Sequence, residues 1–392
     1  MKFLLNYCIS YLLDLLEVFY KKYLIDIDRS VLYCTFGLMF FGLIISLSVA
    51  PAISGRLGIT TYHFFTKQVF FTGIAGVLIM YISRVPIEKL LFYANIFAVI
   101  LIMCLMLVLF VGANIKGSKR WMDIGLFAIQ PSEILKPFFV ILNAKILARA
   151  GGENWQISVV KSIVFTGFIV CLLLLEPDFG MTVIYVFTSG IQMFVAGIPL
   201  RVLKNMGIIF ILLCICAFLT FPHIRNRISG FTGSAGDIEL NYQVKKAMQS
   251  IQEGGFLGKG PGGGVVKYQL PDSHTDFVFA VICEEFGYLV ASIVLCIYSY
   301  IILRNLILIS RISDSKRNIL IMYGCVFIIF AQVLINIGVN INILPNKGMT
   351  LPFISYGGSA IVGMGILMGI ILCLTKDIHR VRSPYKKIFS PF

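Results

Sequence analysis

Apolar runs of about spanning length recur ten times along the 392-residue chain. A helix needs about 20 predominantly apolar residues to cross the hydrocarbon core of a bilayer. The runs fall near residues 32–50, 64–83, 90–112, 132–148, 158–176, 180–199, 205–221, 275–303, 318–342 and 351–375. Composition agrees, because 58% of the residues are hydrophobic and only 13% are charged, unlike an ordinary soluble domain. We therefore predict an all-α polytopic membrane protein with about ten transmembrane helices.

Lysine and arginine residues orient the predicted bundle. Ten helices place both termini on one side, and most of the 33 Lys and Arg residues fall on the cytoplasmic side when the termini are cytoplasmic. This orientation leaves one long outer loop, residues 222–274, between helices 7 and 8. The positive-inside rule then accounts for the net charge of +14, and no nucleic-acid partner is expected.

The chain divides into three predicted parts. Residues 1–30 form a cytoplasmic or interfacial segment, because they are apolar but carry Asp14 and Glu17 and lack a small-residue cleavage site. Residues 31–376 form the ten-helix membrane domain. Residues 377–392 form a basic cytoplasmic tail.

Cations also gather where the positive-inside rule predicts few of them. Three outer loops carry Lys or Arg: residues 113–131, 222–274 and 343–350. Long translocated loops escape the rule, which explains the second loop but not the two short ones. A cationic outer surface suits an anionic, lipid-linked ligand, because Arg and Lys recognise phosphate through charge-assisted hydrogen bonds.

Two short motifs border the first of these loops. "GSKRWMDIGLFAIQPSE", residues 117–133, places Arg120 and Trp121 at a helix exit. Lys136 follows about one turn inside the next span, where it either snorkels or has a ligand or carboxylate partner. "EPDFG", residues 176–180, is either a solvated outer turn or part of a site.

The stretch "LPDSHTDFVFAVICEEFG", residues 270–287, concentrates charge at the mouth of a predicted span. Asp276 falls in the expected first turn, capped by Ser273 or Thr275, where the helix dipole favours a carboxylate. It is therefore either a structural acid or a reactive one. Glu284 and Glu285 cannot both face lipid cheaply, so at least one points into the bundle.

The glycine-rich run "GGFLGKGPGGG", residues 254–264, does not match a phosphate-binding P-loop, because its spacing is wrong and Gly260 follows Lys259. We expect tight turns there, with backbone amides that could line an anion site. "NKGMTLPFISYGGSA", residues 346–360, brings Lys347 and Ser355 to the same outer mouth, near Asn336 and Asn340.

Taken in order, these motifs resemble the SEDS family (shape, elongation, division and sporulation proteins). Within it the chain is similar to the division-type FtsW branch more than to the RodA branch, because "KGMT" precedes Leu351. The resemblance spans about residues 30–375. It implies ten transmembrane helices and an inverting peptidoglycan glycosyltransferase acting on lipid II, with a class B penicillin-binding (FtsI-like) transpeptidase and other divisome proteins as partners at the septum of the bacterial cytoplasmic membrane.

The resemblance also implies roles for residues. The family's essential aspartate matches Asp276, and its outer glutamate matches Glu133. The family's loop cations and tryptophan match the remaining motif positions, which are Arg120, Trp121, Lys136 and Lys347. We add His274 and Ser355 as substrate-binding candidates, since they flank Asp276 and Lys347 in the same motifs.

The predicted chemistry needs a base and a stabilised leaving group. Asp276 would deprotonate the attacking sugar hydroxyl, and Arg120, Lys136 and Lys347 would stabilise the departing pyrophosphate, with Mg²⁺ or Mn²⁺ as a candidate cofactor. Three alternatives stay open: a lipid II flippase, for which buried charges are also typical, a RodA-type elongation polymerase, and a scaffold without activity.

Overall fold

The computed structural model describes residues 26–58, 60, 62–115, 118–125, 127–150, 155–220, 238–312, 315–345 and 348–382. Four predicted features lie partly or wholly outside these ranges: most of the N-terminal segment, residues 222–237 of the long outer loop, the end of the basic tail, and Lys347.

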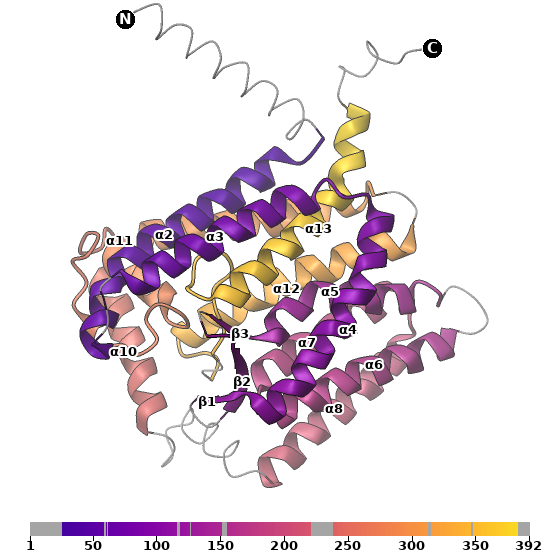
Figure 1. Cartoon of the computed structure of the whole chain (residues 1–392), viewed down its shortest axis with the longest axis horizontal. Helices are drawn as coiled ribbons and strands as arrows, with labels where there is room; N and C mark the ends of the chain where they lie inside the picture. The colour runs from indigo at the N-terminus through magenta and orange to yellow at the C-terminus, as the bar shows by residue number, and fades with distance from the viewer. Residues whose placement is uncertain are drawn as a thin grey trace, which may run out of the picture.

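Each of the ten predicted apolar runs coincides with a helix (Figure 1). The helices are α2 (Arg29–Leu57), α3 (His63–Ile82), α4 (Ile87–Val111), α5 (Pro131–Leu147), α6 (Trp155–Leu175), α7 (Phe179–Val195), α8 (Leu200–Thr220), α11 (Val278–Ile309), α12 (Lys316–Asn340) and α13 (Gly358–Arg382). Among the described residues, seven helices are long and apolar enough to cross a membrane, and α7 is a shorter apolar helix. The all-α, multi-pass membrane fold is confirmed, while the count of ten crossings stays a prediction.

Two elements were not predicted. Helix α10 (Ile238–Gly254) lies within the long outer loop and packs against α11. A small antiparallel sheet, in the order β1-β2-β3, forms between α4 and α5 from β1 (Ala113–Ile115), β2 (Ser118–Asp123) and β3 (Ala128–Ile129). The start of α2 and the end of α13 lie at one end of the bundle, and the sheet and α10 lie towards the other (Figure 1).

Helix α13 runs through the middle of the bundle and packs against α3, α5 and α12. Small residues permit this close contact, as in other membrane bundles. A Cβ added to Gly365 would lie 3.0 Å from the Cα of Ala75 on α3, and one added to Gly363 would lie 2.5 Å from the carbonyl oxygen of Glu133 on α5. Helix α13 therefore fixes the position of α5 and of the charged residues at its start.

Helix α11 contains a break at Gly287, whose φ of 75° and ψ of 177° are not helical. The predicted continuous span is therefore wrong at this point. A Cβ added to Gly287 would lie 2.3 Å from the carbonyl oxygen of Phe256, so the glycine allows the outer loop to contact the helix directly. The break separates an outer segment, Val278 to Phe286, from the long apolar remainder of α11.

Candidate functional site

Asp276 lies two residues before α11, which begins at Val278. The prediction that Asp276 occupies the first helical turn is wrong, and Phe277 at the N-cap makes no side-chain capping bond. The physical reason is a turn at Asp272, which has a φ of 55°. The Asp272 carbonyl accepts hydrogen bonds from the backbone N–H groups of Thr275, Asp276 and Phe277, so the chain enters the helix late.

Two asparagines of α12 bind the backbone of Asp276, just before the start of α11. The carbonyl oxygen of Asp276 accepts hydrogen bonds from Asn336 Nδ2 and Asn340 Nδ2, each at 2.9 Å. The Asn340 side-chain oxygen in turn accepts from the Ala280 N–H at 3.0 Å, which satisfies a backbone donor in the first turn of α11. Asn340 thus supplies the cap expected from Ser273 or Thr275, and it does so from another helix.

The segment 348–356 packs against Asp276. An added Cβ on Gly348 would lie 3.6 Å from Asp276 Oδ2, so the residue that follows Lys347 borders the carboxylate. Ser355 Oγ donates to the Thr275 carbonyl at 2.6 Å and accepts from the Leu351 N–H at 2.8 Å. Of the predicted neighbours of Asp276, Ser355 is therefore brought to it, and its buried side chain bonds to backbone groups.

His274 joins the same segment through its backbone and its ring. The His274 carbonyl accepts from the Tyr356 N–H at 2.8 Å. The His274 ring lies 5.4 Å from the Tyr356 ring and 5.1 Å from the Phe64 ring on α3, measured between centroids. His274 therefore belongs to an aromatic group beside Asp276.

Lys136 has a carboxylate partner inside the bundle. Its Nζ lies 2.5 Å from Glu133 Oε2 on the same helix, and the two side chains are 1% and 7% exposed. Of the two alternatives for Lys136, the carboxylate partner is confirmed and the snorkelling side chain is wrong. A charge buried at this depth needs such a partner, because an unpaired ion in a low-dielectric interior is strongly unfavourable.

Arg120 extends from β2 onto the "EPDFG" turn. Its Nε donates to the Glu176 carbonyl at 3.4 Å, its Nη2 donates to the Pro177 carbonyl, and its Nη1 lies 3.6 Å from Asp178 Oδ1. Glu176 and Asp178 are both buried, so the alternative of a solvated outer turn is wrong. Trp121 follows Arg120 on the strand and is half-buried. The pairing of β1 with β2 is irregular here, because Ala113 pairs with Trp121 and Asn114 with Lys119, which leaves Arg120 unpaired between them.

Asp178 connects this turn to α5 and α7. One carboxylate oxygen accepts from the Met181 N–H at 3.2 Å, capping α7, and the other accepts from Gln130 Nε2 at 3.2 Å. The Gln130 N–H donates to Ser359 Oγ at 2.8 Å. Because Ser359 follows the segment that borders Asp276, the segment 348–359 contacts both groups of polar residues.

Glu176 is a functional candidate that sequence reasoning did not single out. It directly follows α6, is fully buried, and neither carboxyl oxygen has a hydrogen-bond partner within the described part of the chain. Burial, followed by the negative charge of Asp178, raises the pKa of Glu176 to about 8, although the positive charge of Arg120 opposes the shift. A carboxyl side chain at the end of an apolar run was the available sequence signal.

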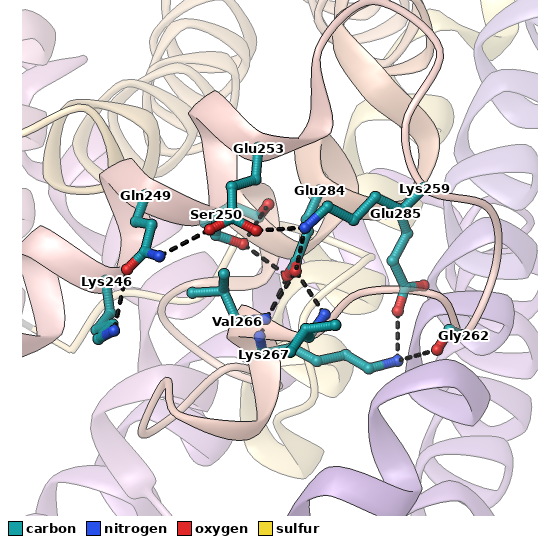
Figure 2. A network of polar contacts seen from close by, with 12 residues as sticks. Lys246, Gln249, Ser250, Glu253, Lys259, Gly262, Val266, Lys267, Glu284 and Glu285 are labelled. Carbon is teal, nitrogen blue, oxygen red and sulfur yellow. Dashed lines mark hydrogen bonds and ion pairs between the residues drawn. The ribbon is translucent and has the colours of Figure 1, made fainter.

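Both glutamates of α11 are fully buried against the outer loop (Figure 2). Glu284 Oε1 accepts from the backbone N–H groups of Val265 and Val266 at 2.6 and 2.7 Å. Glu284 Oε2 accepts from the Lys267 N–H at 3.1 Å and from Ser250 Oγ on α10 at 2.9 Å. The amides after the glycine-rich run therefore do surround an anion, and that anion is a side chain of the protein.

Glu285 is paired with Lys267. The Lys267 Nζ lies 2.5 Å from Glu285 Oε1, and the side chains are 1% and 0% exposed. Ser48 Oγ on α2 donates to Glu285 Oε2 at 2.5 Å, and Lys267 Nζ also donates to the Ser48 carbonyl at 3.0 Å. The expectation that at least one glutamate points inward is confirmed, and the partner that the sequence did not identify is Lys267.

A metal ion has no evident protein cage in this part of the molecule. Across the described ranges, no three His, Cys, Asp or Glu side chains are grouped so as to hold a metal. Mg²⁺ is commonly bound by one or two carboxylates together with substrate phosphates, so the Mg²⁺ or Mn²⁺ prediction stays a prediction.

Known proteins resemble this chain over nearly its whole length. The family model described as "Cell cycle protein", which covers FtsW, RodA and SpoVE, matches residues 28–379. A Caulobacter vibrioides protein named probable peptidoglycan glycosyltransferase FtsW is 32% identical over 353 residues, covering 89% of each chain. A Buchnera aphidicola protein of the same name is 33% identical over 360 residues, covering 90% of each.

Solved structures share the fold. One chain of a peptidoglycan synthase complex matches with a TM-score of 0.74 at 24% identity, covering 91% of this chain and 99% of that one. The Thermus thermophilus rod shape determining protein RodA matches with a TM-score of 0.67 at 23% identity, covering 90% and 98%. Together with the family match over residues 28–379, these comparisons confirm the resemblance found in the motifs, and the chain belongs to the FtsW, RodA and SpoVE family of cell cycle proteins.

Proposed function

We propose that this multi-pass membrane protein is a peptidoglycan glycosyltransferase that polymerises lipid II at the outer face of the cytoplasmic membrane. Relatives of about 32% identity carry that name. The observation that carries the proposal is the placement of Asp276, whose backbone is held by Asn336 and Asn340 and whose carboxylate borders Gly348. A base whose backbone is fixed in this way needs little reorganisation before it takes a proton from a bound hydroxyl.

In the proposed reaction, Asp276 takes the proton of the acceptor sugar's 4-hydroxyl as its oxygen attacks the anomeric carbon of the donor. The bond from that carbon to the undecaprenyl pyrophosphate breaks, and the pyrophosphate leaves with the bonding electron pair. One direct displacement inverts the anomeric configuration. The proton resides on Asp276 until solvent removes it.

The cations divide into two proposed roles. Lys136 is buried against Glu133, so we assign it to holding Glu133 rather than to direct contact with the pyrophosphate. Arg120 is 15% exposed and makes its closest contacts with backbone carbonyls, while its one carboxylate contact, to Asp178, is longer at 3.6 Å. We therefore propose Arg120 as one candidate for contact with the anionic leaving group. Lys347 precedes Gly348 beside Asp276 and is the second candidate for stabilising the leaving group.

We further propose that the protein works in division, with a class B transpeptidase as partner at the septum. Relatives named FtsW support the division role over a RodA-type elongation role. A solved complex described as coordinating polymerization and crosslinking contains a chain of this fold, which supports a transpeptidase partner.

The decisive experiment uses the protein purified with its transpeptidase and supplied with lipid II. Asp276→Asn keeps the shape of the side chain and removes the base, so we expect no glycan strands and an unchanged melting temperature. Asp123→Asn, an exposed carboxylate on β2, is the matched control and keeps activity. Normal polymerisation by Asp276→Asn would refute the assignment, and lipid II flipping in liposomes without polymerisation would favour the transporter alternative.

A further inference from the structure

The glycine-rich run after α10 exposes two large apolar side chains that the proposed reaction does not use. Phe256 is 66% exposed and Leu257 is 74% exposed. They form a tip between Gly255, with φ of 58°, and Gly258, with φ of 77°. Glycine adopts these left-handed conformations without steric penalty, so the sequence builds a turn that holds an apolar pair outward.

The tip is fastened to the break in α11 by backbone hydrogen bonds. The N–H groups of Tyr288 and Leu289 donate to the carbonyls of Gly255 and Phe256 at 2.9 and 3.2 Å. On the other side of the tip, the Lys259 N–H donates to the Glu284 carbonyl at 2.9 Å. The tip therefore occupies a fixed depth, which is that of Gly287.

The lengths of α11 and α2 give the depth of the Gly287 break in the membrane. Arg304 on α11 pairs with Asp28 at the start of α2, so the two helices share a level there. At 1.5 Å per residue, Gly287 lies about 26 Å along α11 from Arg304. Ser48, which is bonded to Glu285, lies about 28 Å along α2 from Arg29. The hydrocarbon core is about 30 Å thick, and Arg29 and Arg304 mark its cytoplasmic edge in the predicted orientation. Both helices place the break at the outer edge of the hydrocarbon core.

The exposed pair continues the apolar surface of α11. Immediately after the break, Tyr288, Leu289 and Ile293 are 40%, 41% and 50% exposed on a helix long and apolar enough to span the membrane. Lys259 is exposed at the other end of the loop and pairs with Glu253 (Figure 2). An apolar tip followed by a cation is the arrangement of segments that lie at the boundary between hydrocarbon and headgroups.

We propose that the tip between Gly255 and Gly258 inserts Phe256 and Leu257 into the outer leaflet of the bilayer, with lipid as its partner. The tip is continuous with Lys267 and the turn before Asp276, so lipid contact also anchors the loop that leads to the candidate base. This inference rests on the depth of the break and stands whether or not Asp276 is catalytic.

Fluorescence in vesicles tests the inference. The chain has two tryptophans, so the double variant Trp121→Phe/Trp155→Phe has no tryptophan fluorescence. Phe256→Trp or Leu257→Trp is then introduced into it as the single reporter. The full-length protein is reconstituted in phosphatidylcholine–phosphatidylglycerol vesicles containing lipids brominated near the headgroup or deep in the chain. Tyr242→Trp is the matched control, since Tyr242 is 45% exposed and lies about 18 Å along α10 from Gly254, beyond the membrane.

We expect blue-shifted emission from position 256, at least twofold quenching by shallow-brominated lipid, and little quenching by iodide. The Tyr242→Trp control should show the reverse. If iodide quenches position 256 as strongly as position 242, or if only addition of the transpeptidase protects it, the tip faces water or a protein and the inference is overturned. Leu257→Trp provides the same measurement should Phe256→Trp fail to fold.

Discussion

The Lys267 ammonium and the Glu285 carboxylate lie 2.5 Å apart, and both side chains are withdrawn from solvent. Lys267 belongs to the outer loop and Glu285 to α11, while Ser48 of α2 bonds to both. One ion pair therefore joins the outer loop, α2 and α11, and its glutamate lies seven residues after the start of α11 at Val278. Asp276 lies on the chain between its two partners, so the pair fixes both ends of the segment that carries the candidate base.

Removing one member of this pair should destabilise the protein more than removing both. Lys267→Met leaves Glu285 charged and buried, a change that costs about 3–5 kcal/mol in comparable buried pairs. Lys267→Met/Glu285→Leu removes both charges and should recover most of that loss. The measurement is the thermal unfolding midpoint of each purified variant. A double variant no more stable than Lys267→Met would show that packing, rather than charge, determines the stability of this contact.

Gly287 should not tolerate a side chain. Its φ of 75° is unfavourable for other residues, and an added Cβ would lie 2.3 Å from the Phe256 carbonyl oxygen. We expect Gly287→Ala to lower the melting temperature and the polymerisation rate together, because the outer loop must move away from α11. Gly167→Ala in α6 is the control, since its added Cβ would meet nothing within 4 Å, and it should be neutral or slightly stabilising. Equal behaviour of the two variants would contradict the proposed close contact.

The sequence predicted the long helices because hydropathy is a local signal that every residue of a span carries. It did not predict α10, whose apolar residues occupy only one face, or β1 and β3, which are three and two residues long. Such elements depend on contacts with distant parts of the chain. The same limit applied to the start of α11, where hydropathy begins at Thr275 but the turn at Asp272 delays the helix.

Some contacts of the candidate site could also be predicted from the sequence, and others could not. The motifs identified Asp276, Glu133 and Lys136 through resemblance, and local spacing already allowed the Glu133–Lys136 contact at three residues apart. The contact of Arg120 with the Glu176 carbonyl joins positions 56 residues apart. No residue pattern in a single sequence encodes such a pairing, so it required the folded chain.

Asn340 should matter for activity through the position of Asp276. Asn340→Ala removes the bond to the Asp276 carbonyl and leaves the Ala280 N–H without its acceptor, a loss of about 1–3 kcal/mol for a buried unsatisfied group. We expect a lower melting temperature and a reduced kcat with a smaller change in KM, because the base is displaced rather than the substrate contacts. Asn95→Ala, which removes an exposed bond to Lys145, serves as the control. A change confined to KM would argue that Asn340 contacts substrate instead.

Glu176 should make stability depend on pH in a defined direction. Burial and the nearby charge of Asp178 raise its pKa from an ordinary value of 4.5 to about 8, so between these values the folded state holds a proton that the unfolded state has released. The free energy of unfolding therefore falls as pH rises through this window and levels off above about pH 8. Glu176→Gln keeps a neutral side chain at every pH and should flatten the slope, which leaves the variant more stable than the native protein at about pH 8.5. Melting temperatures recorded from about pH 5 to 9 test this, with Glu88→Gln, an exposed glutamate paired with Arg317, as the control. If the native protein and Glu176→Gln give parallel profiles, Glu176 does not carry the buried proton.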